Sequence, residues 1–242
     1  MLKEAQEEDD KTGLSRCYNI MSQIYTIKRF DSMAFEWRLK EIELTEKYKL
    51  ENYNISQTYA QIANYYINQK KQKEALAAVE KAIATANSST QQISAKLEFV
   101  NYYSKFGDFQ AAEKLLKECQ AAFEQDKRLE SIKKRLYNIE CLYYQQTKQY
   151  PKALEAAKMQ EKEERRLSES ILSSSHYRTQ GEIYQKMGNM NLAVKYLQMY
   201  INTDDSLKIA NEQVASSEFA TLLNVEKLNA EKKELMLQAQ EK

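Results

Sequence analysis

A tyrosine-centred element repeats five times along this chain and constrains its fold more than any other feature of the sequence. The five tyrosines are separated by 41, 37, 41 and 40 residues. An alanine stands nine residues after each, and a second tyrosine stands seven residues before it in four units, where the remaining unit has Lys96. The columns are Tyr25, Tyr66, Tyr103, Tyr144 and Tyr184; Ala34, Ala75, Ala112, Ala153 and Ala193; and Tyr18, Tyr59, Tyr137 and Tyr177. Such self-similarity predicts a structural repeat.

The spacing of the columns predicts two antiparallel helices in each unit. Residues seven apart lie on one face of a helix, two turns from one another. The nine-residue step crosses a tight turn into a second helix, where the small alanine lets the two backbones approach. The predicted turns hold Gly107 and Gly188, which are suited to positive φ, and Pro151, which is suited to a helix start.

Composition predicts the same all-α fold class. The 242 residues include only 4 Gly and 1 Pro, so long helices joined by short connections are expected. Ala, Leu, Glu, Lys and Gln dominate, and these side chains lose little rotamer freedom in a helix. The alternating β-branched runs typical of strands are missing from the sequence.

Two of the units resemble the tetratricopeptide repeat (TPR) family. They are FVNYYSKFGDFQAAEKLLKEC at 99–119 and YRTQGEIYQKMGNMNLAVKYL at 177–197. The family pattern has a bulky aromatic, a Leu-Gly pair and a tyrosine in the first helix, then an alanine and an aromatic in the second. The resemblance implies a right-handed superhelix of about five antiparallel helix pairs plus a long C-terminal helix. Repeats of about 40 residues exceed the usual 34, which predicts helices longer by about one turn each.

The first unit departs from this pattern after its turn. Arg38 occupies a position where an apolar residue belongs. Phe35, Trp37, Leu39 and Ile42 are available to supply the core face instead.

The sequence divides into three segments. Residues 1–13 are expected to be the end of a preceding repeat helix, with Asp9, Asp10 and Thr12 at its exit. Residues 14–203 form the TPR-like array, and residues 204–242 a C-terminal capping or linker helix.

The last segment begins at Thr203-Asp204-Asp205-Ser206, a run suited to cap a helix N-terminus. The 36 residues after it hold no Gly or Pro and have a loose 3-4 apolar spacing. Two alternatives remain open: a helix that covers the last repeat, or a coiled coil that forms a homodimer with a second copy.

The stretch 204–242 also resembles the segment that follows the repeats in bacterial membrane-bound sensor histidine kinases. The resemblance implies a sensory region in the periplasm, part of an inner-membrane protein of a two-component system. The membrane span and the kinase would then lie in flanking segments. The alternative is a cytosolic TPR adaptor, or a peptide-responsive regulator, that binds a protein partner in its concave groove.

Charge disfavours nucleic acid as the partner. The chain has 36 basic and 35 acidic side chains, a net charge of +1, so it lacks the positive excess that displaces counterions from phosphate. The densest basic stretch, Lys127 to Arg135, is typical of a solvated helix face. No apolar run approaches the roughly 20 residues needed to cross a bilayer.

Residues suited to catalysis or to metal and cofactor binding are scarce. His176 is the only histidine and is expected to be half-exposed on a helix; His-cluster metal sites are excluded. The four glycines match neither phosphate-binding loop pattern. Cys17, Cys119 and Cys141 lie in apolar helical patterns, which predicts buried thiols. A non-catalytic chain without cofactor or metal is therefore predicted.

The expected ligand is a protein or peptide segment lying along the concave face, which the first helices line. With each tyrosine buried, that face is predicted to carry Asn19, Gln23, Gln57, Asn64, Asn68, Asn101, Lys105, Arg135, Asn138, Gln145, Arg178, Glu182 and Lys186. The alternative is an ordinary wet polar surface. The lysine-asparagine clamp for a C-terminal carboxylate is not reproduced, because Ala60 and Leu97 accompany Asn64 and Asn101.

Overall fold

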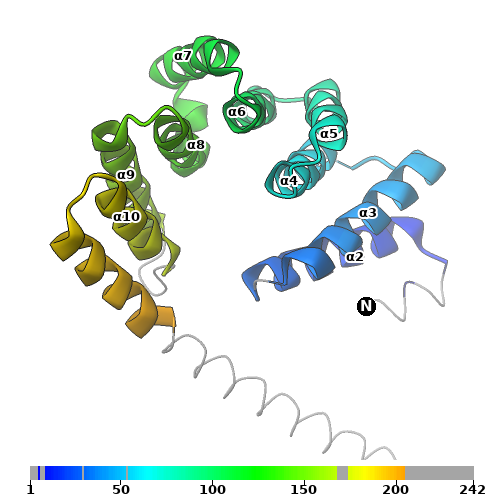
Figure 1. The fold of residues 1–242 in the computed structure, drawn as a ribbon. Coiled ribbons are helices and arrows are strands. Elements are labelled where there is room, and N and C mark those ends of the chain that lie inside the picture. Colours follow the sequence, from blue (N-terminus) through cyan, green and yellow to red (C-terminus); the bar gives the residue numbers. More distant parts are fainter. Residues whose placement is uncertain (1–4, 6–8, 29, 53, 168–173, 205–242) are drawn as a thin grey trace, which may run out of the picture. The chain divides into compact units, whose positions relative to one another are not determined.

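The computed structural model describes residues 5, 9–28, 30–52, 54–167 and 174–204 (Figure 1). All regular structure in these residues is helical, as predicted. The chain divides into two compact units, Met1–Ser170 and Ile171–Lys242.

The five predicted helix pairs are confirmed. Four pairs belong to the first unit: α2 (Lys11–Ile27) with α3 (Asp31–Tyr48), α4 (Ile55–Asn68) with α5 (Gln72–Ala84), α6 (Ser89–Phe106) with α7 (Phe109–Gln125), and α8 (Lys133–Gln146) with α9 (Tyr150–Leu167). A 3-10 helix, η1 (Lys127–Ile132), connects α7 to α8. The second unit pairs α10 (Ser175–Lys186) with the helix at residues 190–204.

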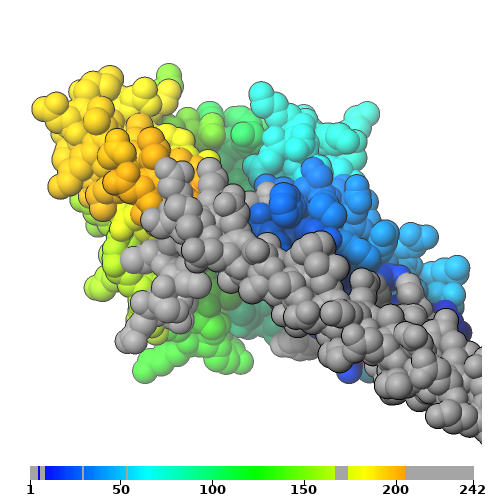
Figure 2. All heavy atoms as spheres, turned by 90° about the horizontal axis from the view of Figure 1, so that it is seen from below, coloured from blue at the N-terminus to red at the C-terminus, as the bar shows by residue number. Residues whose placement is uncertain are grey.

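Successive pairs of the first unit pack through their first helices. α4 contacts α6, and α6 contacts α8, whereas α5 and α7 lie on the other side (Figure 1). The first pair joins the array through contact of α3 with α4, and in Figure 2 its atoms adjoin those of α4 and α5. Two apolar clusters fill the interior, one around Ile62, Val79 and Ala82, and one around Leu97 and Leu116.

Two backbone hydrogen bonds explain the nine-residue step between the tyrosine and alanine columns. In all five pairs, the N–H five residues after the tyrosine donates to the tyrosine carbonyl, with N···O distances of 2.8–3.0 Å. The carbonyl of that fifth residue then accepts from the alanine N–H at 2.9–3.0 Å, the first hydrogen bond of the second helix. The first bond satisfies a carbonyl that the end of the helix would leave without a partner.

This turn needs a left-handed residue four positions after the tyrosine. Gly107 (φ 93°) and Gly188 (φ 78°) adopt it as predicted. In two other units the position holds Lys70 (φ 58°) and Lys148 (φ 59°), so the turn geometry prevails over the intrinsic preference of lysine.

Small buried residues hold each pair of helices together. The alanine column is only 0–2% exposed. A second small column, three residues before the tyrosine, escaped the sequence analysis; it is Ser22, Ala63, Val100, Cys141 and Gly181. A Cβ on Gly181 would stand 2.8 Å from Leu197 Cγ, so α10 and residues 190–204 approach at a distance that only glycine permits. The tyrosines themselves are mostly half-buried; Tyr59 and Tyr184 are buried.

The extra length of the repeats is not spread evenly over the helices. α3, α6 and α9 have 18 residues, whereas α4 and α8 have 14. Part of the length is used in connections such as η1. The expectation of one additional turn in every helix is therefore wrong, because connections absorb residues as readily as helices do.

Local expectations at both ends of the array need correction. Asp9 and Asp10 do form a helix exit, since Asp9 is left-handed (φ 55°) and the Asp10 N–H donates to the Ala5 carbonyl at 3.0 Å. Asp10 also begins α2, because its carboxylate accepts from the N–H of Gly13 at 2.9 Å. Thr12 lies within α2. Thr203 and Asp204 continue the helix that starts at residue 190, and the Thr203 hydroxyl donates to the Met199 carbonyl within it at 2.8 Å. The rest of the predicted C-terminal helix lies outside the described residues.

His176 is buried and not half-exposed, with 3% of its surface accessible. Its ring packs edge-on against Tyr177 at a centroid distance of 4.7 Å. The three cysteines are buried as predicted.

We expect glycine to stabilise the turn position more than another residue does in two different units. Lys148→Gly should raise the free energy of unfolding by about 0.5–1 kcal/mol, because the left-handed backbone conformation is less favourable for lysine than for glycine. Gly107→Ala should lower it by about 1 kcal/mol, although the added Cβ meets no atom within 4 Å. Urea denaturation measures both changes. Glu80→Gly, at an exposed position inside α5, is the control and should lower the free energy of unfolding. A decrease of the same size from Lys148→Gly would contradict the idea that lysine is strained in the left-handed turn position.

Burial raises the pKa of the Cys119 and Cys141 thiols to about 11. Neither thiol should react with a disulfide reagent in the folded chain at pH 8, and both should react in urea. Because the unfolded chain ionises first, the free energy of unfolding should fall as pH rises from about 9 to about 11. A Cys119→Ala, Cys141→Ala variant should lose that part of the pH dependence. Prompt modification of the folded protein at either thiol would contradict the burial.

Candidate functional site

A stripe of four amides runs along α4. Gln57, Gln61, Asn64 and Asn68 are spaced by four, three and four residues, which places them on one face of the helix. This amide stripe is about 16 Å long, enough for about five residues of an extended chain. Asn68 Nδ2 donates to Asn64 Oδ1 at 3.0 Å. Three of the four residues were predicted; the sequence analysis missed Gln61, although its place in the same helical spacing marks it.

A hollow of about 270 Å³ lies at one end of the amide stripe, between α2, α3 and α4. Arg38 forms part of its wall and is only 7% exposed. Its Nε donates to Gln61 Oε1 at 2.7 Å and its Nη2 to Thr26 Oγ1 at 2.6 Å. Burial lowers the pKa of Arg38, and the charge of Asp31 opposes that shift. The residue that broke the repeat pattern thus links the first helix pair to the second through polar contacts.

A smaller hollow of about 120 Å³ lies at the other end of the amide stripe, between α4, α6 and the segment leading into α8. Gln57 and Arg135 line it. Arg135 Nη2 pairs with Glu98 Oε1 at 2.6 Å, while Arg135 Nε is buried without a hydrogen-bond partner. The Arg135 side chain thus joins α8 to α6 beside the smaller hollow.

Asn101 does not lie on an open face. It is 7% exposed and its Nδ2 donates to Glu98 Oε2 at 3.3 Å. The prediction failed because α6 packs against both α4 and α8, which covers a position that would be open on an isolated helix pair.

The other predicted residues of the first unit are dispersed. Asn19 donates to Glu41, and Gln23 donates to Asn19 at 2.5 Å. Lys105 is exposed on α6, and Asn138 is half-buried on α8. Gln145 Nε2 donates to Cys141 Sγ at 3.3 Å, which turns it toward its own helix.

Three predicted residues belong to the second unit, where Arg178, Glu182 and Lys186 are exposed on α10. Arg178 Nε lies 3.8 Å from Glu182 Oε1. Their arrangement is that of an ordinary solvated helix face.

Carboxylates partner most of the basic stretch before and within α8. Lys133 pairs with Glu130 at 3.1 Å, and Lys134 pairs with Glu164 at 3.2 Å. These basic side chains therefore hold elements of the fold together.

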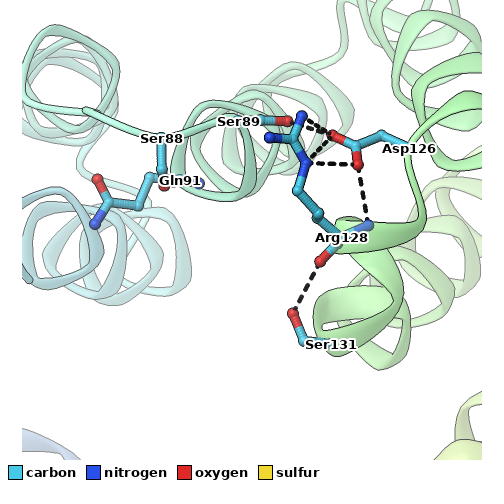
Figure 3. Close-up of polar contacts among 6 residues, drawn as sticks. All are labelled: Ser88, Ser89, Gln91, Asp126, Arg128 and Ser131. Carbon is cyan, nitrogen blue, oxygen red and sulfur yellow. Dashed lines mark hydrogen bonds and ion pairs between the residues drawn. The ribbon is translucent and has the colours of Figure 1, made fainter.

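Asp126 organises the neighbouring connection (Figure 3). It accepts from Ser89 Oγ at 2.9 Å and from the backbone N–H and guanidinium of Arg128. These hydrogen bonds hold the pKa of Asp126 well below its usual range. The connection joins the start of α6 to η1.

Within the described residues, no group of three or more His, Cys, Asp or Glu side chains is placed to hold a metal ion. No helix of the described part of the chain has an 18-residue stretch apolar enough to cross a bilayer.

No protein-family model matches the chain, and no curated protein matches it either. Solved structures do. BtubC from P. vanneervenii matches with a TM-score of 0.50 and 14% identity over 86% of this chain and 88% of that chain. The type IV pilus biogenesis factor PilW matches with a TM-score of 0.50 and 18% identity over 83% and 82%. A Podosopora anserina structure described by its TPR-like repeats gives 0.42 and 16% over 79% and 95%.

The fold is a TPR-like array of helix pairs. Its basis is the repeated turn, the buried alanine column and the packing of successive first helices. The two solved structures with a TM-score of 0.50 share this fold. At these identities the likeness concerns the fold alone.

We expect Arg135 to contribute to stability. Arg135→Met should lower the free energy of unfolding by about 3 kcal/mol, because Glu98, 2% exposed, loses its counter-ion. Adding Glu98→Gln should recover most of the loss, and thermal or urea melting measures both variants. Lys117→Met, which breaks the exposed pair of Lys117 with Glu113, is the control and should change little. Equal losses from Arg135→Met and Lys117→Met would contradict this role.

Proposed function

We propose that this chain is a non-catalytic scaffold that binds an extended segment of a protein partner along the amide stripe. The stripe carries the proposal because each amide offers both a donor and an acceptor, the two groups that a peptide backbone presents. Such side chains bind a backbone without requiring one particular sequence. A stripe of about 16 Å also matches a short linear segment better than a small molecule.

One end of the stripe adds a charge preference. Arg38 has no carboxylate within 4.0 Å among the described residues, so its charge is balanced only by neutral acceptors and by more distant groups. At the opposite end, Arg135 lines the smaller hollow, but its guanidinium already pairs with Glu98. A guanidinium binds a carboxylate with two parallel hydrogen bonds. We therefore propose a partner segment with an acidic side chain, or a chain terminus, near one end.

The setting of this scaffold follows from the resemblance of residues 204–242, of which 205–242 lie outside the described residues. We propose a sensory region of a periplasmic, membrane-bound signalling protein, in which the segment after residue 204 transmits binding to a kinase and pairs with its copy. A cytosolic adaptor would use the same stripe. Reading the gene beyond Lys242 separates them: a hydrophobic span followed by a kinase histidine motif supports the sensory setting, and a stop codon there ends it.

Display of a random peptide library against the chain tests the binding function. We expect enriched peptides to lose about tenfold or more in affinity for an Asn64→Ala, Asn68→Ala variant, since each hydrogen bond contributes about 1 kcal/mol. Both residues are at least partly exposed and bond mainly to one another, so the variant should fold. Fluorescence polarisation measures the affinities.

Gln110→Ala is the matched control, since it removes an exposed amide from α7, on the other side of the array. It should leave the affinities unchanged. Peptides that bind both variants equally, or a library that enriches nothing, would refute the proposed stripe.

A further inference from the structure

Glu41 of α3 is a carboxylate buried to 1% exposure, and its hydrogen-bond partners among the described residues are all neutral. Asn19 Nδ2 lies 3.3 Å from Oε1 and 3.2 Å from Oε2. Asn52 Nδ2 donates to Oε1 at 2.9 Å, and Thr58 Oγ1 donates to Oε2 at 3.3 Å. These donors come from α2, from the connection after α3 and from α4, so they hold the carboxylate at the junction of three segments.

No lysine or arginine of the described residues lies within 4.0 Å of Glu41. Arg38, one turn earlier on the same helix, donates instead to Gln61 and Thr26, and its charge acts on Glu41 only from beyond 4.0 Å. A buried carboxylate without a counter-ion costs far more than one that is paired. Three neutral donors reduce that cost but leave the negative charge in place.

The carboxylate forms part of the wall of a cavity of about 380 Å³, between α2 and the connection from α3 to α4. Asn19 and Asn52 line the same cavity, so its polar groups converge on one point. Ile20 and Leu50 supply apolar walls.

Charged groups at the cavity favour a cation. Glu41 and Glu51 contribute two carboxylates, against the single guanidinium of Arg16. Arg16 and Glu51 are exposed and screened by water, whereas the Glu41 carboxylate is not. The strongest electrostatic feature of the cavity is therefore a desolvated negative charge.

We propose that this cavity binds a primary ammonium group carried on a short aliphatic chain, with the nitrogen against Glu41 and the carbons along Ile20 and Leu50. An ammonium has three donors, and an ionised carboxylate accepts about four hydrogen bonds. The long contacts from Asn19, shared between both oxygens, are the ones that an ammonium displaces. The same chemistry arises in a free alkyl diamine and in the lysine side chain of a peptide.

Two probes distinguish these sources, and both are titrated into the isotope-labelled full chain. Cadaverine stands for a free amine, and Nα-acetyl-lysine N-methylamide stands for a lysine side chain. Saturable shifts of the Asn19 and Asn52 side-chain amide signals are expected for one or both. 1-Pentanol, with a similar carbon chain and no charge, should produce none.

Glu41→Gln should weaken binding of the ammonium probe at least tenfold, whereas Glu51→Gln, at an exposed carboxylate of the same cavity, should weaken it less than about threefold. If Glu41→Gln does not fold, Ile20→Trp is the second variant. Ile20 is 45% exposed, so a larger side chain there should occlude the cavity without disturbing the core. The proposal is overturned if neither probe saturates at millimolar concentration, if 1-pentanol binds equally, or if Glu41→Gln or Ile20→Trp retains full affinity.

Discussion

The hydrogen bond from the N–H five residues after each column tyrosine to that tyrosine's carbonyl sets the geometry on which the other elements depend. It closes the first helix and places the carbonyl of that fifth residue where it accepts from the N–H of the column alanine, which is the first hydrogen bond of the second helix. Because the bond recurs in all five pairs, each pair makes the same turn, and the alanine that follows the turn is buried in each. A larger residue there would separate the helices and expose the small column opposite. The turn is strict enough that Lys70 and Lys148 adopt a left-handed backbone to maintain it.

The first pair differs from the others in what it buries. The covered face of α3 includes Arg38, Glu41 and Thr45 beside Ala34 and Ile42, where the later pairs bury mainly apolar groups. Buried charges destabilise a fold unless hydrogen bonds compensate them, and both charges are surrounded by donors or acceptors from α2 and α4. A buried network of this kind stabilises a fold less than apolar packing of the same volume does. The junction of the first two pairs is therefore the part of the array that most favours ligand recognition.

Packing also separates two kinds of polar residue that look alike in the sequence. Asn64 and Asn101 both follow the helical spacing of a first helix, yet Asn64 lines a hollow and Asn101 is buried against Glu98. Arg135 lines the smaller hollow, yet its guanidinium pairs with the buried Glu98. Substitution of Asn101 or Arg135 therefore tests the stability of the fold, whereas substitution of Asn64 and Asn68 tests binding at the surface.

The sequence by itself determined the helix pairs, the five repeats, the glycine turns and the burial of the cysteines, because these depend on local periodicity and on backbone preferences that recur at fixed spacing. It also identified Arg38 as a polar residue at an apolar position of the repeat, but not the contacts that its side chain makes. The tertiary structure alone decided which polar residues share a surface. The amide stripe, the covered position of Asn101 and the cavity beside Glu41 all depend on how neighbouring pairs pack, and Glu41 meets donors up to 22 positions away along the chain. Contacts between segments that are far apart in the chain produce no periodic pattern in the sequence, so only the tertiary structure identifies them.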